Sequence, residues 1–390
     1  MRYLTLVLVL LATWPIAACG SGKTAVSVTT PSDLASSPAA TTPRAAADPP
    51  SSGAAAPAPV ASPTPLWKMA GQMVMAGMGG PTPSPGLLSA VRKGHIGGVI
   101  LYAANISPAL PGALALLQRT AAAGHNPPLL ISVDQEGGPI RRFAGGPPTV
   151  GPREMTSARQ AFDQGALTGR FLRHRGVNVD LAPVSDVTLS SSGFEIGQDR
   201  GFAGGPQRVA SLASAFTRGL QQARVAATAK HFPGIGALTV DSDFQLARVR
   251  ASPSRLRVTE LVPFARETRD GVRLVMVANA IYPLLDPSGT PAGFSSRIIR
   301  GLLKGQLGFG GVVITDALDS PPQLGGTFGS RAVRAARAGA DIVLFAPAGA
   351  GPRAYGSLLS AARSSALSRS RLQDAYRRIL ALKRSLSHGR

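Results

Sequence analysis

The stretch GGVVITD, residues 310–316, is rich in Val and Ile and ends at Asp316. Comparable apolar runs recur along the chain. Most of them are continuous rather than alternating, which predicts strands that are buried on both faces of a parallel sheet. The full set is QMVMAG (72–77), GGVILY (97–102), PLLISVD (128–134), GVNVDLAP (176–183), RVAATAK (224–230), VRLVMVAN (272–279), GGVVITD (310–316) and ADIVLFA (340–346).

The segments between these runs have a helix-like composition, and glycine near their ends fits helix stops. Examples are PGALALLQRTAAAG, QRVASLASAFTRGLQQA and SRAVRAARAG. Eight strand–helix alternations in roughly 300 residues predict an α/β fold, a single (β/α)8 barrel of the TIM type. A doubly wound open sheet is the alternative, and the lack of a glycine-rich dinucleotide fingerprint after the first run disfavours it.

Polar side chains stand at or near the ends of five runs. In a barrel the carboxyl ends of all strands open on one face, where active sites lie. A single Asp at such a place is more often a helix cap, but five strand ends that meet at one mouth favour an enzyme. These residues are Asp134, Asp180, Lys230, His231, Asn279 and Asp316.

The first twenty residues, MRYLTLVLVLLATWPIAACG, have the proportions of a secretory signal and are too short for a stable membrane span. The last of them resemble a bacterial lipobox, in which the cysteine receives lipid and becomes the mature N-terminus. Cys19 is the single cysteine of the chain. We therefore expect a lipoprotein signal peptide over residues 1–18, export, and lipid anchoring through Cys19 to the outer face of the cytoplasmic membrane. An ordinary cleaved signal is the alternative.

Residues 19–65 consist mainly of Ala, Pro, Ser and Thr, and this composition predicts a disordered tether ahead of a barrel domain over residues 66–390. The net charge is +21, with 41 Lys and Arg against 20 Asp and Glu. The export signal argues against nucleic acid as a partner and favours anionic envelope polymers or lipid head groups. A GC-rich genome that favours arginine accounts for such a charge equally well.

Six motifs occur in an order that resembles the N-terminal barrel of glycoside hydrolase family 3, particularly its single-domain bacterial β-N-acetylglucosaminidases. They are DQEGGPIRRF (134–143), GVNVDLAPVSDV (176–187), IGQDRGF (196–202), KHFPGIG (230–236), GVVITDAL (311–318) and AGADIVLF (338–345). The resemblance covers nearly all of residues 66–386. It implies a barrel that needs neither a metal nor an organic cofactor and takes a carbohydrate substrate.

The resemblance also implies roles for individual residues. Asp316 matches the carboxylate nucleophile, which forms a covalent glycosyl-enzyme. Four other residues match positions that bind sugar hydroxyls, and they are Asp134, Arg200, Lys230 and His231. A retaining glycosidase needs one ionised carboxylate below the sugar ring and a proton donor beside the leaving oxygen.

The chain departs from the family where that proton donor is expected. The acetylglucosaminidase branch carries Asp-Ser-His on the loop after KHFPG, and its histidine is the general acid/base. This chain has Asp241, Ser242 and Asp243 there. Asn279 also stands where a histidine is usual, and it remains a candidate sugar contact.

Three interpretations of the departure stay open. In the first, Asp243 is the acid/base, and the like-charged Asp241 raises the pKa of one of the two carboxyls. In the second, the donor is another carboxylate, such as Asp199, Glu195 or Asp319. In the third, the protein hydrolyses glycosides poorly and serves as a sugar-binding lipoprotein.

We expect the protein to be a retaining glycosidase that releases terminal β-linked N-acetylhexosamine, with peptidoglycan-type cell-wall fragments as substrates. A β-glucosidase-like hydrolase with an altered acid/base is an alternative. The sequence leaves open the natural glycan, the choice between water and phosphate as acceptor, and the oligomeric state.

Overall fold

The computed structural model describes residues 63–188, 199–242 and 244–387. These residues belong to one compact unit, Ser62–Arg390. The predicted signal peptide, Cys19 and nearly all of the predicted tether lie outside the described residues, as do Glu195 and Asp243.

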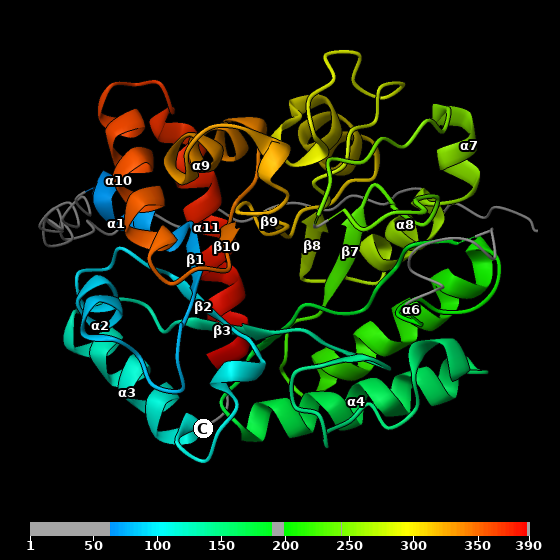
Figure 1. The fold of residues 1–390 in the computed structure, drawn as a ribbon, viewed down its shortest axis with the longest axis horizontal. Coiled ribbons are helices and arrows are strands. Elements are labelled where there is room, and N and C mark those ends of the chain that lie inside the picture. The colour runs from blue at the N-terminus through cyan, green and yellow to red at the C-terminus, as the bar shows by residue number, and fades with distance from the viewer. Residues whose placement is uncertain (1–62, 189–198, 243, 388–390) are drawn as a thin grey trace, which may run out of the picture. The chain divides into compact units, whose positions relative to one another are not determined.

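Each of the eight predicted runs overlaps a strand, although β7 continues two residues past its run, and all eight strands pair in parallel (Figure 1). The prediction of an α/β fold with parallel strands is therefore confirmed. The strands are β1 (Val74–Gly77), β2 (Gly98–Leu101), β3 (Leu130–Val133), β6 (Val179–Asp180), β7 (Thr228–Phe232), β8 (Leu274–Val277), β9 (Val312–Thr315) and β10 (Val343–Phe345).

The strands form a five-stranded sheet in the order β10-β1-β2-β3-β6 and a three-stranded sheet in the order β7-β8-β9. Isolated parallel bridges between Val179 and Ala226 and between Val184 and Lys230 connect the β6 edge to β7. Another bridge, between Ile314 and Ile342, connects β9 to the chain just before β10. Both edges of the smaller sheet are thus bridged to the larger one.

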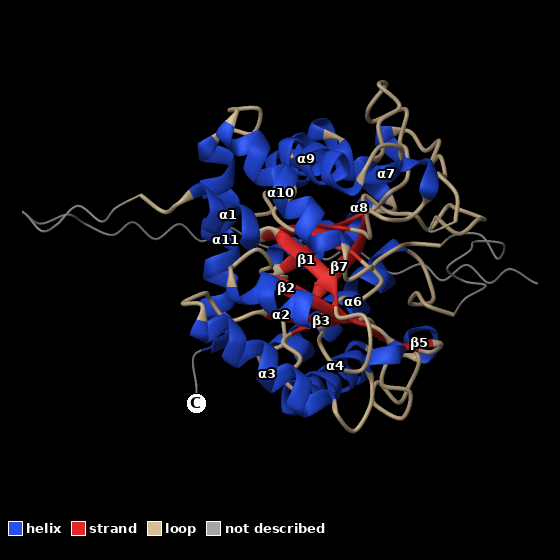
Figure 2. Cartoon of the chain, turned by 60° about the vertical axis from the view of Figure 1, so that its left-hand side comes forward, coloured by secondary structure: helices blue, strands red, loops and turns tan. Residues whose placement is uncertain are grey.

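Burial explains why the strand sequences are continuous apolar runs. Every residue of β1, β2, β3, β8 and β9 is buried, so side chains on both faces of these strands are removed from water. Figure 2 shows the strands at the centre of this unit, with the helices outside them.

Helices follow the strands in alternation, as predicted. The three segments quoted above correspond to α3 (Leu110–Ala123), α6 (Pro206–Gln222) and α9 (Phe328–Ala338). Gly339 caps the end of α9, and its φ of 126° favours glycine. Among the described residues the helices are α1 (Leu66–Gln72), α2 (Pro85–Arg92), η1 (Ala103–Asn105), α3 (Leu110–Ala123), η2 (Pro152–Glu154), α4 (Ala158–His174), α6 (Pro206–Gln222), α7 (Pro253–Val258), α8 (Leu261–Arg269), η3 (Ala292–Phe294), η4 (Arg297–Gln306), η5 (Pro322–Leu324), α9 (Phe328–Ala338), α10 (Ala350–Arg363) and α11 (Arg369–Ser387).

Helices α4 and α6 approach each other closely at glycines. A Cβ on Gly165 would lie 2.2 Å from the carbonyl oxygen of Phe216, and a Cβ on Gly219 would lie 2.3 Å from that of Phe162. Side chains at these two positions would force the helices apart, because such distances are far below van der Waals contact. In the part of the chain that the structure describes, no helix is long and apolar enough to cross a bilayer.

The connections that leave the carboxyl ends of the strands carry the polar residues of interest. After β3 the chain forms an antiparallel hairpin of β4 (Gln135–Gly137) and β5 (Ile140–Arg141). The backbone N–H of Gln135 donates to Oδ1 of buried Asp180 at 3.0 Å, which fixes the start of this hairpin. Asp180, one of the polar residues predicted at strand ends, therefore stabilises the start of the hairpin through this hydrogen bond.

Candidate active site

A cavity of about 290 Å³ opens at the carboxyl ends of the strands. Six of the residues predicted for the site line this cavity, although they come from four different strand ends and loops. The polar side chains that line it are Tyr102, Asp134, Glu136, Arg142, Arg200, Lys230, His231, Asp241, Ser242, Asp316, Asp319 and Ser320.

Lys230, in the middle of β7, is the centre of an ion-pair network in this cavity. Its Nζ lies 2.8 Å from Oδ1 of Asp134 and 2.6 Å from Oε1 of Glu136. Glu136 also accepts two hydrogen bonds from Arg200, each 2.9 Å long. Arg142 lies 3.7 Å from the other oxygen of Asp134. We call Asp134, Glu136, Arg200 and Lys230 the charged cluster.

The charges of this cluster stabilise one another. Burial disfavours the charge on Glu136, but Arg200 and Lys230 hold the pKa of that carboxyl well below its ordinary value. Burial also opposes the charge on Lys230, yet Asp134 and Glu136 raise the pKa of that amine above its ordinary value. Glu136 and Lys230 are therefore both charged around neutral pH, and the geometry of the charged cluster is fixed before a ligand arrives.

His231 is held by a carboxylate that the sequence analysis did not identify. Nδ1 of His231 lies 2.8 Å from Oδ2 of buried Asp186, which also accepts from the backbone N–H groups of His231 and Ile235. Burial disfavours the imidazolium form, but Asp186 and, further away, Asp316 raise the pKa of His231. Asp186 thus fixes the orientation of a ring that lines the cavity.

Asp316 directly follows β9, which places its carboxylate in the cavity. Its backbone N–H donates to the carbonyl of Val277 at 3.0 Å, and its Oδ1 accepts from the N–H of Ala317 at 2.8 Å. These bonds hold the side chain close to the backbone of the next turn.

Asn279 binds the backbone of the turn that follows Asp316 and is not among the residues that line the cavity. Its Nδ2 donates to the carbonyls of Ala317 at 2.9 Å and Ser320 at 2.8 Å. Sugar contact by Asn279 stays a prediction, while its described contacts position the chain that follows Asp316.

The candidate proton donors fall in different places. Asp241 and Asp319 line the cavity, and Oδ1 of Asp319 accepts from the N–H of Ala346 at 2.7 Å. Asp199 lines a separate hollow beside Arg153, 3.4 Å from its Nε. Asp243 and Glu195 lie outside the described residues.

The cavity also contains groups that sequence reasoning missed, chiefly Glu136 and Tyr102. Glu136 lies in the quoted DQEGG motif, two residues after Asp134, and this spacing in a strand-end motif was an available signal. Burial and the nearby carboxylates of Asp134 and Asp319 raise the pKa of Tyr102, so its hydroxyl stays neutral. Tyr102 ends the quoted run GGVILY (97–102), and this position at a strand end was an available signal.

This arrangement suits a small ligand rich in hydroxyl groups. Fixed carboxylates accept hydrogen bonds from hydroxyls, and fixed ammonium and guanidinium groups donate to their oxygens. Among the described residues there is no group of three or more His, Cys, Asp or Glu that could hold a metal ion. A polar pocket at the carboxyl ends of parallel strands is typical of α/β enzymes, and the polar groups of this one suit a hydroxyl-rich ligand such as a sugar.

Comparison with known proteins identifies the family. The model of the glycosyl hydrolase family 3 N-terminal domain matches residues 68–382. The chain therefore belongs to glycoside hydrolase family 3, which confirms the resemblance found in the sequence. Its relatives place it among the glycosidases, in the β-hexosaminidase-like group.

Two relatives found by sequence comparison are described as glycosyl hydrolases or β-hexosaminidases. A protein of Arthroderma benhamiae described as an uncharacterized secreted glycosyl hydrolase is 33% identical over 334 residues, covering 83% of this chain and 94% of that protein. A β-hexosaminidase of Nitrosomonas eutropha is 38% identical over 262 residues, covering 64% of this chain and 73% of that protein.

Solved structures agree with these relatives. The family 3 β-N-acetylglucosaminidase from Paenibacillus sp. superposes with a TM-score of 0.79 at 36% identity, covering 84% of this chain and 64% of that one. This chain thus spans slightly less than two thirds of the Paenibacillus protein. A β-N-acetylhexosaminidase from Beutenbergia cavernae gives a TM-score of 0.74 at 30% identity, with 83% and 99% coverage.

Proposed function

We propose that this protein is a retaining β-N-acetylhexosaminidase with Asp316 as its nucleophile. The observation that carries the proposal is that Asp316 and the charged cluster line one cavity of about 290 Å³. A nucleophile needs a bound sugar held in one orientation, and the cluster offers donors and acceptors for its hydroxyls. The names of the β-hexosaminidase relatives support an N-acetylhexosamine at the non-reducing end as the substrate.

The proposed reaction has two displacements. In the first, a carboxylate oxygen of Asp316 forms a bond to the anomeric carbon while the bond to the leaving oxygen breaks, and that oxygen takes a proton from the acid. In the second, water gives a proton to the same group and attacks the anomeric carbon. This attack releases the sugar and restores the Asp316 carboxylate.

The acid/base that we propose first is Asp243, with Asp241 as its electrostatic partner. Asp241 and Ser242, which precede Asp243 in the sequence, line the cavity. Asp319 is the alternative donor, because it lines the same cavity at the turn after Asp316. Asp199 is disfavoured, since the hollow that it lines is a different one.

We also propose the finer architecture expected from the sequence. Closure of the eight strands into one (β/α)8 barrel is supported by the isolated bridges at both edges of the three-stranded sheet. A tether over residues 19–65 and lipid anchoring at Cys19 on the outer face of the cytoplasmic membrane rest on the sequence alone. The description of the Arthroderma relative as secreted supports export. Cell-wall fragments are then accessible substrates.

A sugar-binding role without efficient turnover is the second candidate. The observation that favours it is Asp243, which stands in place of the family's acid/base histidine. Loss of general acid help alone costs on the order of 10²–10⁴ in rate.

The test is turnover of an aryl β-N-acetylglucosaminide and of the matching aryl β-glucoside. We expect preferential hydrolysis of the first, and a loss on the order of 10⁴ or more in kcat for Asp316→Ala. Asp163→Ala, which changes an exposed carboxylate on α4, is the matched control and should leave the rate unchanged. A folded protein that binds N-acetylglucosamine without turning over either glycoside would replace the enzyme by the binding role. Preference for the glucoside would replace the proposed substrate.

A further inference from the structure

Helix α11 covers the end of the strands opposite to the cavity. Arg378 of α11 donates to Asp341, just before β10, at 2.8 Å and 2.9 Å. Lys383 donates to the carbonyl of Gly97, just before β2, at 2.8 Å. Ser385 accepts from Arg273, just before β8. Because each of these partners precedes a strand, α11 lies across the amino ends of the strands.

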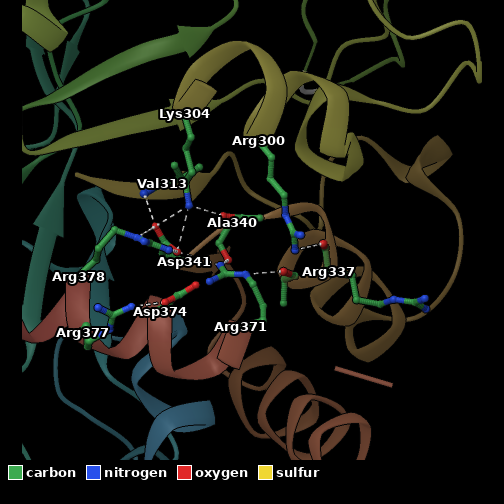
Figure 3. A network of polar contacts seen from close by, with 12 residues as sticks. Arg300, Lys304, Val313, Arg337, Ala340, Asp341, Arg371, Asp374, Arg377 and Arg378 are labelled. Carbon is green, nitrogen blue, oxygen red and sulfur yellow. Dashed lines mark hydrogen bonds and ion pairs between the residues drawn. The ribbon is translucent and has the colours of Figure 1, made fainter. Parts of the chain in front are cut away.

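The Asp341 network shows how this end of the molecule is charged (Figure 3). Asp341 is fully buried and accepts from Lys304, Arg371 and Arg378, so one carboxylate lies among three cations. Around it, Figure 3 shows Arg300, Arg337 and Arg377 as well, and Arg377 pairs with Asp374. Positive charge therefore exceeds negative charge in this region.

Exposed cations continue across the rest of this end. In alternating strand–helix folds the helices finish where the next strand begins, so the helix ends lie at the amino ends of the strands. We call the exposed cations at these helix ends, together with the exposed arginines of α11, the basal face. Its exposed residues are Arg92, Lys93, Arg224, Arg269, Arg337, Arg369, Arg377 and Arg384.

Carboxylates at this end are few in the described chain, and those found are engaged. Asp341 is buried in its network, Asp374 pairs with Arg377, and Asp270 pairs with arginines of α6 and α8 at 3.0 Å and 2.7 Å. Cations at helix ends also offset the helix dipole. That role does not explain the outer arginines of α11, because Arg369 and Arg377 stand in its first half rather than in its last turn.

The chain that precedes the unit joins it beside the same helix. The carbonyl of Thr64 accepts a hydrogen bond from Arg369 at 2.9 Å, and Gln72 at the end of α1 accepts from Lys383 of α11. A segment that leads to the N-terminus therefore leaves the unit next to the basal face, whereas the catalytic cavity opens at the opposite ends of the strands.

We propose that the basal face docks on a bilayer that contains anionic phospholipids. Arginines near such a surface are attracted by its negative potential, and several of them act together. Docking in this way directs the cavity away from the membrane and toward its substrates. The proposal does not depend on glycosidase activity, nor on lipidation at Cys19.

The test uses residues 20–390, which lack Cys19 and keep the whole compact unit. Co-sedimentation is measured with vesicles of phosphatidylcholine containing roughly 30% phosphatidylglycerol, and with pure phosphatidylcholine. We expect binding only to the anionic vesicles, and loss of this binding at about 0.5 M NaCl, because salt screens exposed charges. Arg337→Gln combined with Arg377→Gln should weaken binding on the order of 25-fold, about fivefold for each charge.

Arg255→Gln combined with Arg257→Gln is the matched control. These arginines are exposed on α7, which lies away from α11 in both overall views (Figures 1 and 2). The control should bind as wild type does, and circular dichroism checks that both double variants fold. Equal binding to neutral vesicles, or equal weakening of the two double variants, would overturn the proposal. Binding to soluble polyglutamate without binding to vesicles would assign the face to an anionic polymer instead.

Discussion

Nζ of Lys230 lies 2.6 Å from Oε1 of Glu136, and both side chains are at most 2% exposed. This pair joins β7 to the hairpin that follows β3, two elements that are distant in the sequence. Glu136 also binds Arg200, so one carboxylate fixes two cations that line the cavity. The contact makes Glu136 a positioning residue for the predicted sugar site.

Glu136→Gln should therefore affect both stability and binding. The substitution keeps the shape but removes one carboxylate from buried Lys230, which keeps Asp134, and from half-buried Arg200, and we expect this loss to cost about 3 kcal/mol of unfolding free energy. We expect KM for the aryl glycoside to rise on the order of tenfold, with a smaller change in kcat. Denaturant unfolding and steady-state kinetics measure the two effects. Glu154→Gln, at an exposed carboxylate, is the control, and an equal response of the two variants would contradict the account.

Asp341 should be among the residues most important for stability. Asp341→Asn leaves Lys304, Arg371 and Arg378 around a neutral group, and an uncompensated buried charge typically costs about 3–5 kcal/mol. Asp163→Asn breaks the exposed pair with Arg159 and should cost about 0–1 kcal/mol. Chemical denaturation compares the two variants. If Asp341→Asn lowers the unfolding free energy by less than about 1 kcal/mol, the network is not stabilising.

Glu267 should make stability depend on pH. It is fully buried, where burial raises its pKa from 4.5 to about 7, although the hydroxyls of Ser185 and Thr217 donate to it. Between pH 4.5 and 7 the folded state therefore holds a proton that the unfolded state has lost. Stability from this group is present below the unfolded pKa and falls as pH rises toward 7, by about 3 kcal/mol in total.

Glu267→Gln mimics the protonated carboxyl and removes this dependence. We expect the variant to gain stability relative to wild type between pH 5 and pH 7.5. Urea unfolding at pH 5 and pH 7.5 gives the unfolding free energy of the variant and of wild type, and the difference between the two proteins should grow with pH. Glu154→Gln serves as the reference. Parallel pH profiles for wild type and Glu267→Gln would contradict the raised pKa.

The identity of the proton donor has a kinetic signature. A general acid matters most when the leaving group is poor, because a good leaving group departs without a proton. Asp243→Asn should slow an unactivated glycoside by roughly 10²–10⁴ and a dinitrophenyl glycoside much less. Asp319→Asn is the matched comparison at the alternative site. If only Asp319→Asn shows the leaving-group dependence, the donor is Asp319.

The strands were predictable because burial on both faces leaves a continuous apolar run. Gly97 to Tyr102 and Gly310 to Asp316 are examples, and each contains a strand where expected. The polar strand ends were predictable for the same reason, since Asp134, Lys230 and Asp316 break an apolar run at its last position. The family motifs then supplied roles that the pattern alone did not.

The supporting partners were not predictable, because their contacts join residues distant in the sequence. Asp186 and His231 are 45 residues apart, and Lys230 and Asp134 are 96 apart. The hydrogen bonds from Nδ2 of Asn279 to the carbonyls of Ala317 and Ser320 were not predictable either, because backbone carbonyls leave no trace in the sequence. The cations that bind Asp341 likewise converge only through packing, because Lys304 comes from η4 and Arg371 and Arg378 come from α11.

Covalent trapping of Asp316 tests the central claim most directly. A 5-fluoro-N-acetylglucosaminyl fluoride has a leaving group that needs no acid, and its ring fluorine slows release of the intermediate. The trap therefore does not depend on the identity of the proton donor. We predict one added glycosyl group per chain, located by peptide mass spectrometry on Asp316 and absent in Asp316→Ala. Labelling of another carboxylate, or turnover of the reagent without any labelling of Asp316, would contradict the account.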